Sequence, residues 1–220
     1  MQNGKKFFTL LALCGIFAVA MAYLEATVVV YLREIYYPNG FKFPLVELSH
    51  FMLATEIGRE FSTLVMLAVL ASLISTNRRE WFAYFAYSFG VWDIWYYIWL
   101  KVLLNWPSSL LDWDILFLIP LPWIGPVLAP VLVSISLIVA AYFILYFENR
   151  GSPILLTQFE WLLEILAALI IIGSFLIPLE IVIKRQEPNN FHWWIFMLGW
   201  FLGLTIFGYR TYQSSKSKKY

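Results

Sequence analysis

A short run of charged side chains interrupts a segment that is otherwise apolar enough to lie inside a bilayer. Glu56, Arg59 and Glu60 follow one another closely within the stretch 50–75. A charge at the centre of a bilayer costs about 2.5–3.5 kcal/mol on insertion scales, so such residues normally face a protein interior or a water-filled cavity. Glu56 and Glu60 share one face of a helix, and Arg59 can lie beside Glu56. This turn is the first candidate site.

Two further acids, Glu25 and Asp93, lie in neighbouring apolar segments. With a helical rise of about 1.5 Å per residue, Glu25 lies about 12 Å below the end of its segment at Arg33. Glu56 lies about 13 Å below Glu47, where the second segment starts, and Asp93 lies near the middle of the third. Three helices therefore bring acids to a similar depth. We predict one catalytic site made of Glu25, Glu56, Arg59, Glu60 and Asp93.

Several chemistries can use such a constellation. The carboxylates of Glu25, Glu56, Glu60 and Asp93 are of the type that binds divalent metals in helical bundles, although the Glu-x-x-His pair of di-iron sites is missing. A carboxyl group crowded by other acids in a low dielectric can act as a general acid or base, or can carry a proton. Arg59 can hold an anionic head group in a bidentate grip. The structural alternative is that these residues pair with one another and hold the bundle together.

The predicted substrate-binding residues come from the third apolar segment and from the loop after it. Tyr96 follows Asp93 by one helical turn, so both side chains can contribute to one polar spot. Asp112 and Asp114 flank Trp113, and they either complete an acidic site or cap a helix that starts at Ile115. Trp123 is the fourth member of this set.

The loop itself, 105–124, is rich in proline and tryptophan. Proline at this density removes backbone donors and breaks helices. The loop either dips into the outer leaflet, where protein or water must satisfy its backbone, or lies along the interface as a rigid segment anchored by tryptophans. Both interpretations stay open at this point.

Composition places the whole chain in a membrane. Of its 220 residues, 61% are hydrophobic, 20% are aromatic and only 13% are charged, whereas a soluble domain has about 25% charged residues. The net charge of +1 and the lack of a basic face exclude nucleic acid as an expected partner. Cys14 is the only cysteine, which excludes a disulfide, a cysteine-based metal site and a thiol redox pair within the chain.

The chain is predicted to be an all-α, multi-pass bundle of about six transmembrane helices in a single domain, 1–220. A span needs about 20 mainly apolar residues, and the first such stretch has no cleavage pattern of a signal peptide, so it is interpreted as a retained helix. A short basic tail, 211–220, follows the last span. The predicted helices are 7–32, 47–75, 81–104, 125–147, 159–183 and 191–209.

Basic residues near the helix ends predict the orientation, because Lys and Arg are enriched on the cytoplasmic side. With both termini cytoplasmic, the inner side holds the larger set: Lys5, Lys6, Arg78, Arg79, Arg150, Arg210, Lys216, Lys218 and Lys219. The outer side then holds Arg33, Lys42, Lys101, Lys184 and Arg185. The expected location is the cell membrane, with the acidic site in the outer half of the bilayer.

Three functions fit these observations. The first is an enzyme that acts on a lipid-like substrate, with or without a divalent metal. The second is a proton-coupled transporter or proton conduit that uses the same carboxylates. The third is an accessory subunit that binds a membrane-protein partner. The sequence contains no phosphate loop, nucleophile elbow, HExxH pair or dinucleotide fingerprint that would name a reaction.

Overall fold

The protein is mostly helical, at 72%, which agrees with the predicted fold class. The structure is a computed structural model that describes residues 2–216, and side chains from residue 7 to residue 216. The elements in chain order are α1 (Gln2–Tyr36), α2 (His50–Ile74), α3 (Arg78–Leu104), β1 (Trp113–Phe117), β2 (Trp123–Pro126), α4 (Leu128–Asn149), α5 (Gln158–Leu176), α6 (Leu179–Ile183) and α7 (Trp193–Lys216).

Local sequence explains where several helices begin and end. At the start of α2, the Ser49 side chain accepts a hydrogen bond from the N–H of Met52, and Thr157 with Glu160 forms a capping box at the start of α5. Such caps satisfy N–H groups that have no partner in the first helical turn. α1 ends shortly before Pro38, and Pro178 separates α5 from α6. Proline lacks an N–H group and clashes with the preceding turn, so it interrupts a helix.

Two predicted helices differ from the observed ones in ways that matter for the site. The first was expected to end at Leu32, but α1 continues for another turn to Tyr36. The length of an apolar segment indicates how much of a helix can lie in lipid. The helix itself can continue past that segment into polar residues, as α1 does. The predicted helix 159–183 is interrupted at Pro178, and its last part forms the short helix α6.

The region after α3 also differs from the expectation. Within the predicted loop, residues 113–117 and 123–126 form an antiparallel β-hairpin, so α4 begins at Leu128 rather than at residue 125. Pro120 and Pro122 lie in the turn, and Pro126 is the last residue of its strand, positions at which a missing N–H is tolerated. Residues 211–216, predicted as part of a tail, continue α7, and the remaining tail residues lie outside the described part of the chain.

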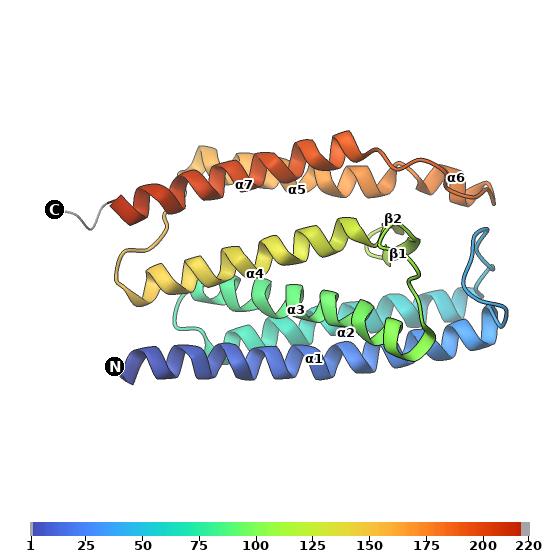
Figure 1. Ribbon diagram of the computed structural model, residues 1–220, viewed down its shortest axis with the longest axis horizontal. Helices are drawn as coiled ribbons and strands as arrows, with labels where there is room; N and C mark the ends of the chain where they lie inside the picture. Colours follow the sequence, from blue (N-terminus) through green and yellow to red (C-terminus); the bar gives the residue numbers. More distant parts are fainter. Residues whose placement is uncertain (1, 217–220) are drawn as a thin grey trace.

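The helices form two groups (Figure 1). α3 packs against α1, α2 and α4, and α5 packs against α7 in a second layer that meets the first through α4 and the hairpin. The beginning of α1 and the end of α7 lie at the same end of the molecule, which we call the terminus end. The hairpin, the 37–49 loop and α6 lie at the opposite end, which we call the hairpin end.

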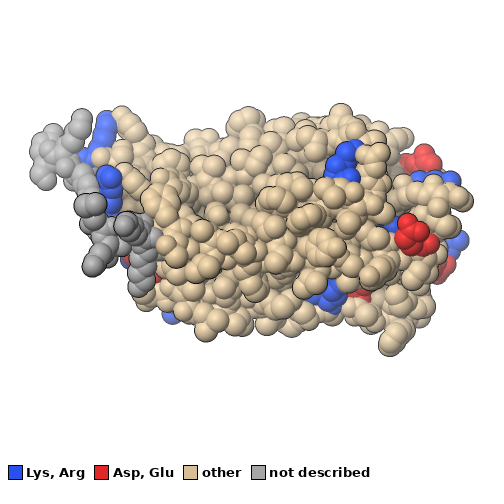
Figure 2. All heavy atoms as spheres, turned by 60° about the horizontal axis from the view of Figure 1, so that its bottom comes forward, with Lys and Arg blue, Asp and Glu red and all other residues tan. Residues whose placement is uncertain are grey.

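Four helical segments of the described chain are long and apolar enough to cross a membrane: 7–36, 50–74, 128–149 and 158–183. About six were expected. α3 and α7 are long enough but less apolar, because Trp, Tyr and Gly lower their mean hydropathy. One face of the molecule is largely free of charged side chains across its middle, with Lys, Arg, Asp and Glu nearer the two ends (Figure 2). These features indicate a membrane-embedded protein.

The terminus half of the first layer is filled by apolar side chains. One cluster includes Leu11, Cys14, Ala83 and Leu145 from α1, α3 and α4. Next to it, towards the hairpin end, a second cluster joins Ala18, Ala22, Leu67 and Trp92. Small residues on α1 let the helices approach closely, as is common in membrane bundles. This half of the bundle is consequently a packed core.

α3 and α4 come closest at Gly90. A Cβ atom at this position would lie 2.7 Å from the backbone oxygen of Ser134 and 2.9 Å from Cγ1 of Ile138. The Ser134 oxygen belongs to the backbone, and Cγ1 of Ile138 lies close to its own backbone. Neither atom can move away from an added methyl group unless α4 shifts. Gly90 therefore sets the separation of α3 and α4 one turn from Asp93, which lies in the candidate site.

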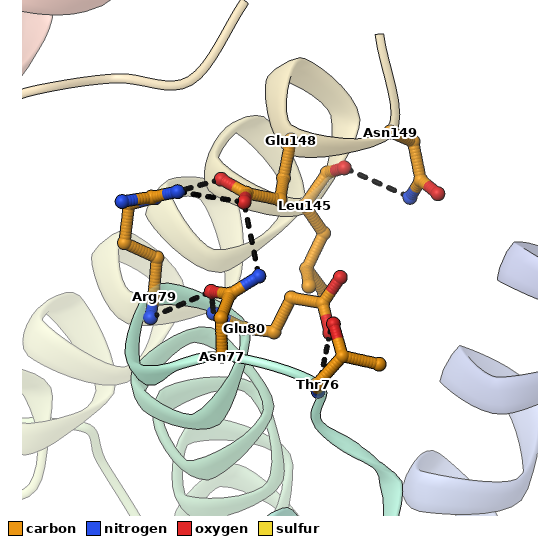
Figure 3. A network of polar contacts seen from close by, with 7 residues as sticks. All are labelled: Thr76, Asn77, Arg79, Glu80, Leu145, Glu148 and Asn149. Carbon is orange, nitrogen blue, oxygen red and sulfur yellow. Dashed lines mark hydrogen bonds and ion pairs between the residues drawn. The ribbon is translucent and has the colours of Figure 1, made fainter. Parts of the chain in front are cut away.

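A polar network ties the start of α3 to the end of α4 at the terminus end (Figure 3). Asn77 accepts hydrogen bonds from the N–H groups of Arg79 and Glu80, and its side-chain amide donates to Glu148 (3.0 Å). Arg79 also donates to both oxygens of Glu148, at 2.8 and 2.9 Å. Asn77 thus serves as a helix cap and as a link between two helices.

Replacing Asn77 by Ala should lower the free energy of unfolding by about 1–3 kcal/mol, since both a cap and a hydrogen bond between helices are lost. Thermal unfolding of the purified protein in detergent measures this loss. Asn149→Ala is the matched control, because among the described residues the Asn149 side chain donates a hydrogen bond to the Leu145 carbonyl of its own helix and to no other helix. An equal loss in both variants would contradict the linking role.

Gly90→Ala should lower the free energy of unfolding by about 1–3 kcal/mol, because the added methyl group overpacks the contact between α3 and α4. Gly58→Ala is the control in α2, where a Cβ atom would meet nothing within 4 Å. Alanine is the better helix former by about 0.5–1 kcal/mol, so this variant should be as stable as the wild type or more so. Thermal unfolding compares the two, and destabilisation by Gly58→Ala alone would be the contrary result.

Candidate functional site

A cavity of about 560 Å³ lies at the hairpin end of the first layer. Its walls come from the second half of α1, the 37–49 loop, the first half of α2 and the middle of α3. Residues of the hairpin and of α6 complete it. The packed apolar core of the terminus half begins where the cavity ends, at Trp92 of α3. The cavity therefore belongs to one half of the bundle.

Most of the predicted site residues line this cavity. They are Glu25, Glu56, Arg59, Glu60, Asp93, Tyr96 and Asp114. All five predicted catalytic side chains are among them, although three helices contribute them. Two predicted substrate-binding residues, Asp112 and Trp123, do not line it.

Arg59 joins two helices through carboxylates. Its guanidinium pairs with Glu56 on the preceding turn of α2 at 2.9 Å, and with Glu25 across the interface to α1. The hydroxyl of Thr63 also donates a hydrogen bond to Glu25. Both carboxylates are buried. An ion pair shielded from water is little screened, so this cluster fixes the relative position of α1 and α2.

The sequence of α2 explains why these side chains point inwards. Its buried residues are Glu56, Glu60, Thr63, Leu67 and Ala71, spaced by three or four positions. This spacing is one stripe along a helix. The stripe is apolar where α2 meets the packed core and polar where it meets the cavity. The same face of α2 therefore packs against the apolar core at one end and lines the cavity at the other.

Glu60 and Asp93 differ from the other acids of the cavity, because neither forms an ion pair within the described residues. Glu60 accepts a hydrogen bond from the backbone N–H of Leu118 in the hairpin turn (2.8 Å). Asp93 accepts one from the hydroxyl of Ser134 on α4 (2.8 Å). In each case the hydrogen bond involves one carboxyl oxygen. These two groups are consequently the ones best placed to exchange a proton with a bound molecule.

A second arginine, Arg33, adds to the polar lining. Its guanidinium donates to Asp114 of β1 at 3.2 Å and lies over the rings of Phe41 and Trp106, at 4.3 and 3.8 Å from their centroids. Burial raises the pKa of Asp114 to about 6, and the adjacent Arg33 guanidinium opposes this rise. The carboxyl group of Asp114 thus takes up a proton at a higher pH than an exposed aspartate does.

Asp112, predicted as a substrate-binding residue, lies outside the cavity lining and forms local hydrogen bonds. Its carboxylate accepts hydrogen bonds from the N–H and hydroxyl of Ser108 and from the N–H of Ser109. Burial acts to raise the pKa of Asp112, but these hydrogen bonds outweigh it and hold the pKa below its usual value. Asp112 therefore stabilises the turn before β1. Of the two aspartates around Trp113, only Asp114 reaches the cavity.

The two aromatic members of the predicted set have different positions. The Tyr96 ring lies on the cavity wall, with its centroid 6.4 Å from that of Trp92 and 5.1 Å from that of Tyr97. Trp123 lies in β2 and stacks on Phe175 of α5 with a centroid distance of 6.0 Å. Trp123 therefore anchors the hairpin to the second layer rather than lining the cavity.

The tentative metal site is not assembled. Within the described residues, no group of three or more His, Cys, Asp or Glu side chains is arranged to hold a metal ion. Glu25 and Glu56 bind Arg59, while Glu60 and Asp93 bind separate donors on the hairpin turn and on α4. The four carboxylates share a cavity but do not converge on one point.

Sequence reasoning missed four contributors: Arg33, Thr63, Ser134 and the backbone N–H of Leu118. Arg33 was interpreted only as the end of a span, since the first helix was expected to end at Leu32. The positions 25, 29, 32, 33 and 36 all line the cavity. Their spacing of three or four would have identified this face of α1 if the helix had been extended by one turn. Contacts such as those of Ser134 and Leu118 depend on tertiary packing and leave no pattern in the sequence.

Replacing Arg59 by Met should lower the free energy of unfolding by about 3–5 kcal/mol, because it leaves two buried carboxylates without their cation. Adding Glu25→Gln and Glu56→Gln to the same chain should restore much of the stability, since no unpaired charge then remains. Thermal unfolding in detergent measures all three proteins. A triple variant no more stable than Arg59→Met would contradict the ion-pair account.

Comparisons with protein-family models, with curated proteins and with solved structures found no match for this chain. The chemistry of the cavity is therefore the basis for a functional proposal.

Proposed function

We propose that this protein is a multi-pass membrane enzyme that acts on a lipid-like substrate bound in the cavity at the hairpin end. The observation that carries this proposal is that two carboxyl groups with no ion-pair partner among the described residues, Glu60 and Asp93, line one cavity that also has apolar walls. Their helices differ, so the two groups face the cavity from different sides. A substrate between them would meet an acid and a base.

The size and lining of the cavity support an amphipathic ligand. Its volume of about 560 Å³ lies within the range of about 300–1,000 Å³ that is usual for small-molecule sites. Val29, Leu32, Leu53, Leu116 and Val182 contribute apolar surface to its lining, and charged side chains from α1, α2, α3 and the hairpin contribute polar surface. An apolar chain fits the wall, and a polar head fits the charged part.

In the proposed reaction, Glu60 and Asp93 exchange protons with the substrate. A carboxyl group that forms no ion pair can give a proton to a bound molecule or take one from it, as a general acid or base does. The Arg59 cluster positions α2, and through it Glu60. The hydrogen bonds from Leu118 and Ser134 orient the two carboxyl groups. The cavity thus combines binding, orientation and proton transfer.

In the membrane, we place the cavity in the outer half of the bilayer. The excess of Lys and Arg at the terminus end favours a cytoplasmic location for both termini. α3 and α7, with 27 and 24 residues, are long enough to complete a six-span topology. α3 is surrounded by α1, α2 and α4, so its lower hydropathy suits a helix that faces protein more than lipid.

A proton-coupled carrier would need a polar route from the cavity to the terminus end. The apolar clusters around Leu67, Trp92 and Leu145 lie in that direction. This packing favours access to the cavity from one side of the membrane. An enzyme works with such access, whereas a carrier must also open towards the other side in a second conformation. For this reason we favour the enzyme over the transporter, and the two carboxyl groups that face the cavity favour it over an accessory subunit.

Glu60→Gln and Asp93→Asn should each lower turnover by about 10²–10⁴-fold, the usual contribution of a general acid or base. Mass spectrometry of lipids from cells that express equal amounts of wild-type or variant protein measures this loss as disappearance of the lipid change that the wild type causes. Glu180→Gln is the control, because Glu180 is an exposed acid of α6 that does not line the cavity. Identical lipid profiles for the wild type, the control and both variants would contradict the proposal.

A further inference from the structure

Arg33 is held in place on three sides. The rings of Phe41 and Trp106 contact its guanidinium, and Asp114 accepts a hydrogen bond from Nη2. Arg33 and Asp114 are 7% and 3% exposed, so both side chains are more than nine-tenths buried. Aromatic contacts of this kind stabilise a cation and restrict its movement. The guanidinium is consequently a fixed hydrogen-bond donor on the cavity wall.

The contact between Arg33 and Asp114 uses only half of each group. Nη1 of Arg33 and Oδ2 of Asp114 are buried and have no partner in hydrogen-bonding geometry among the described residues, although the nearby Tyr97 side chain acts to lower the pKa of Asp114. Both residues line the cavity. Buried polar groups are rarely left without a partner, and a free charged donor beside a free charged acceptor is costly. The pair is therefore suited to a bound group that both accepts and donates a hydrogen bond.

The charge of the cavity narrows the choice of this group. Its lining includes six acidic side chains but only three arginines. Even when Glu60 and Asp93 hold protons, four acidic side chains remain against three arginines, so a phosphate head with two negative charges would still be repelled. A hydroxyl group accepts one hydrogen bond and donates another without adding charge. It satisfies Nη1 of Arg33 and Oδ2 of Asp114 at the same time.

We infer that the substrate is an uncharged amphiphile with a hydroxyl-bearing head group, and that Arg33 and Asp114 bind this hydroxyl. The inference rests on the proposed function, because it names the head group that the same cavity receives. The hydroxyl accepts a hydrogen bond from Nη1 of Arg33 and donates one to Oδ2 of Asp114. The apolar chain lies along the wall that includes Leu32, Leu53 and Leu116.

Competition between three oleoyl probes tests the head group directly. Purified full-length protein in lauryldimethylamine N-oxide, a detergent without hydroxyl groups, is given equal amounts of monooleoylglycerol, its di-O-methyl ether and oleoyl lysophosphatidic acid. Native mass spectrometry separates the bound probes by mass. Monooleoylglycerol should be retained about tenfold or more over each of the others, since one lost hydrogen bond to a buried charged group costs about this factor.

Variants of Arg33 and Asp114 test whether these two residues cause the preference for monooleoylglycerol. Arg33→Lys keeps the positive charge but loses the planar fork, and Asp114→Asn replaces the free acceptor by an amide. In each variant the preference for monooleoylglycerol over the ether should fall to about twofold or less, which corresponds to the loss of that hydrogen bond. Lys184→Gln is the control, because Lys184 is an exposed basic residue paired only with Glu180 on its own helix within the described chain. It should keep the wild-type preference.

Equal retention of the ether and the alcohol by the wild type would overturn the inference, and this result needs no variant to fold. Preferential retention of lysophosphatidic acid would also overturn it, since that outcome requires an anion site. An unchanged preference in Arg33→Lys and Asp114→Asn would place the hydroxyl elsewhere and overturn the assignment. The proposed function is tested separately by the lipid profiles of the Glu60 and Asp93 variants. Probe selectivity with unchanged lipid profiles would show binding without the proposed chemistry.

Discussion

Two carboxylates from different helices share the guanidinium of Arg59, and the architecture of the hairpin end depends on this ion cluster. Towards that end, the buried stripe of α2 holds no apolar residue beyond Leu67, only Thr63, Glu60 and Glu56. Apolar packing therefore cannot hold this half of α2 against α1. In a low dielectric the attraction between opposite charges is strong, but each charge must be paired to offset its desolvation. The cluster meets this condition for Glu25, Glu56 and Arg59 together.

The same constraint explains why loops, rather than helices alone, complete the cavity. Arg33 and Glu60 need partners that the helices do not supply, and the hairpin brings Asp114 to the first and the Leu118 N–H to the second. Trp123 anchors the hairpin on the other side, where it stacks on Phe175 of α5. The hairpin thus couples the second helical layer to the polar groups of the first. Its position is set by apolar contacts on one face and by charge on the other.

The sequence contained enough information to predict the helices and the shared depth of the acids. Apolar length marks the spans, and helical rise alone relates Glu25, Glu56 and Asp93, which all line one cavity in the structure. The β-hairpin could not be predicted in this way, because its prolines suggest an irregular loop. They fall in its turn and at its end, where a strand does not need their N–H groups.

The misplaced end of the first helix had the larger consequence for the site. Arg33 lies one residue beyond the predicted end at Leu32, so it was treated as a marker of topology rather than as part of a helix face. Its partners Phe41, Trp106 and Asp114 come from three separate loops or strands, and no local pattern relates them. Pairings of this kind arise from tertiary contacts across long stretches of chain. The spacing of residues in the sequence could have identified the face of α1 on which Arg33 lies, but not the partners of Arg33.

Two neighbouring turns in the middle of α3 show how one helix can serve both stability and function. At Gly90 it approaches α4 so closely that no side chain fits, and the neighbouring core is filled by Ala, Leu and aromatic residues. One turn further, Asp93 turns a hydrogen-bonded carboxyl group to the cavity. A carboxyl group is oriented well only when its helix cannot shift, so tight packing next to the site restricts the geometry of the acid. The close contact at Gly90 fixes the backbone of α3 from which Asp93 projects. The chemistry proposed for Asp93 therefore depends on the packing at Gly90.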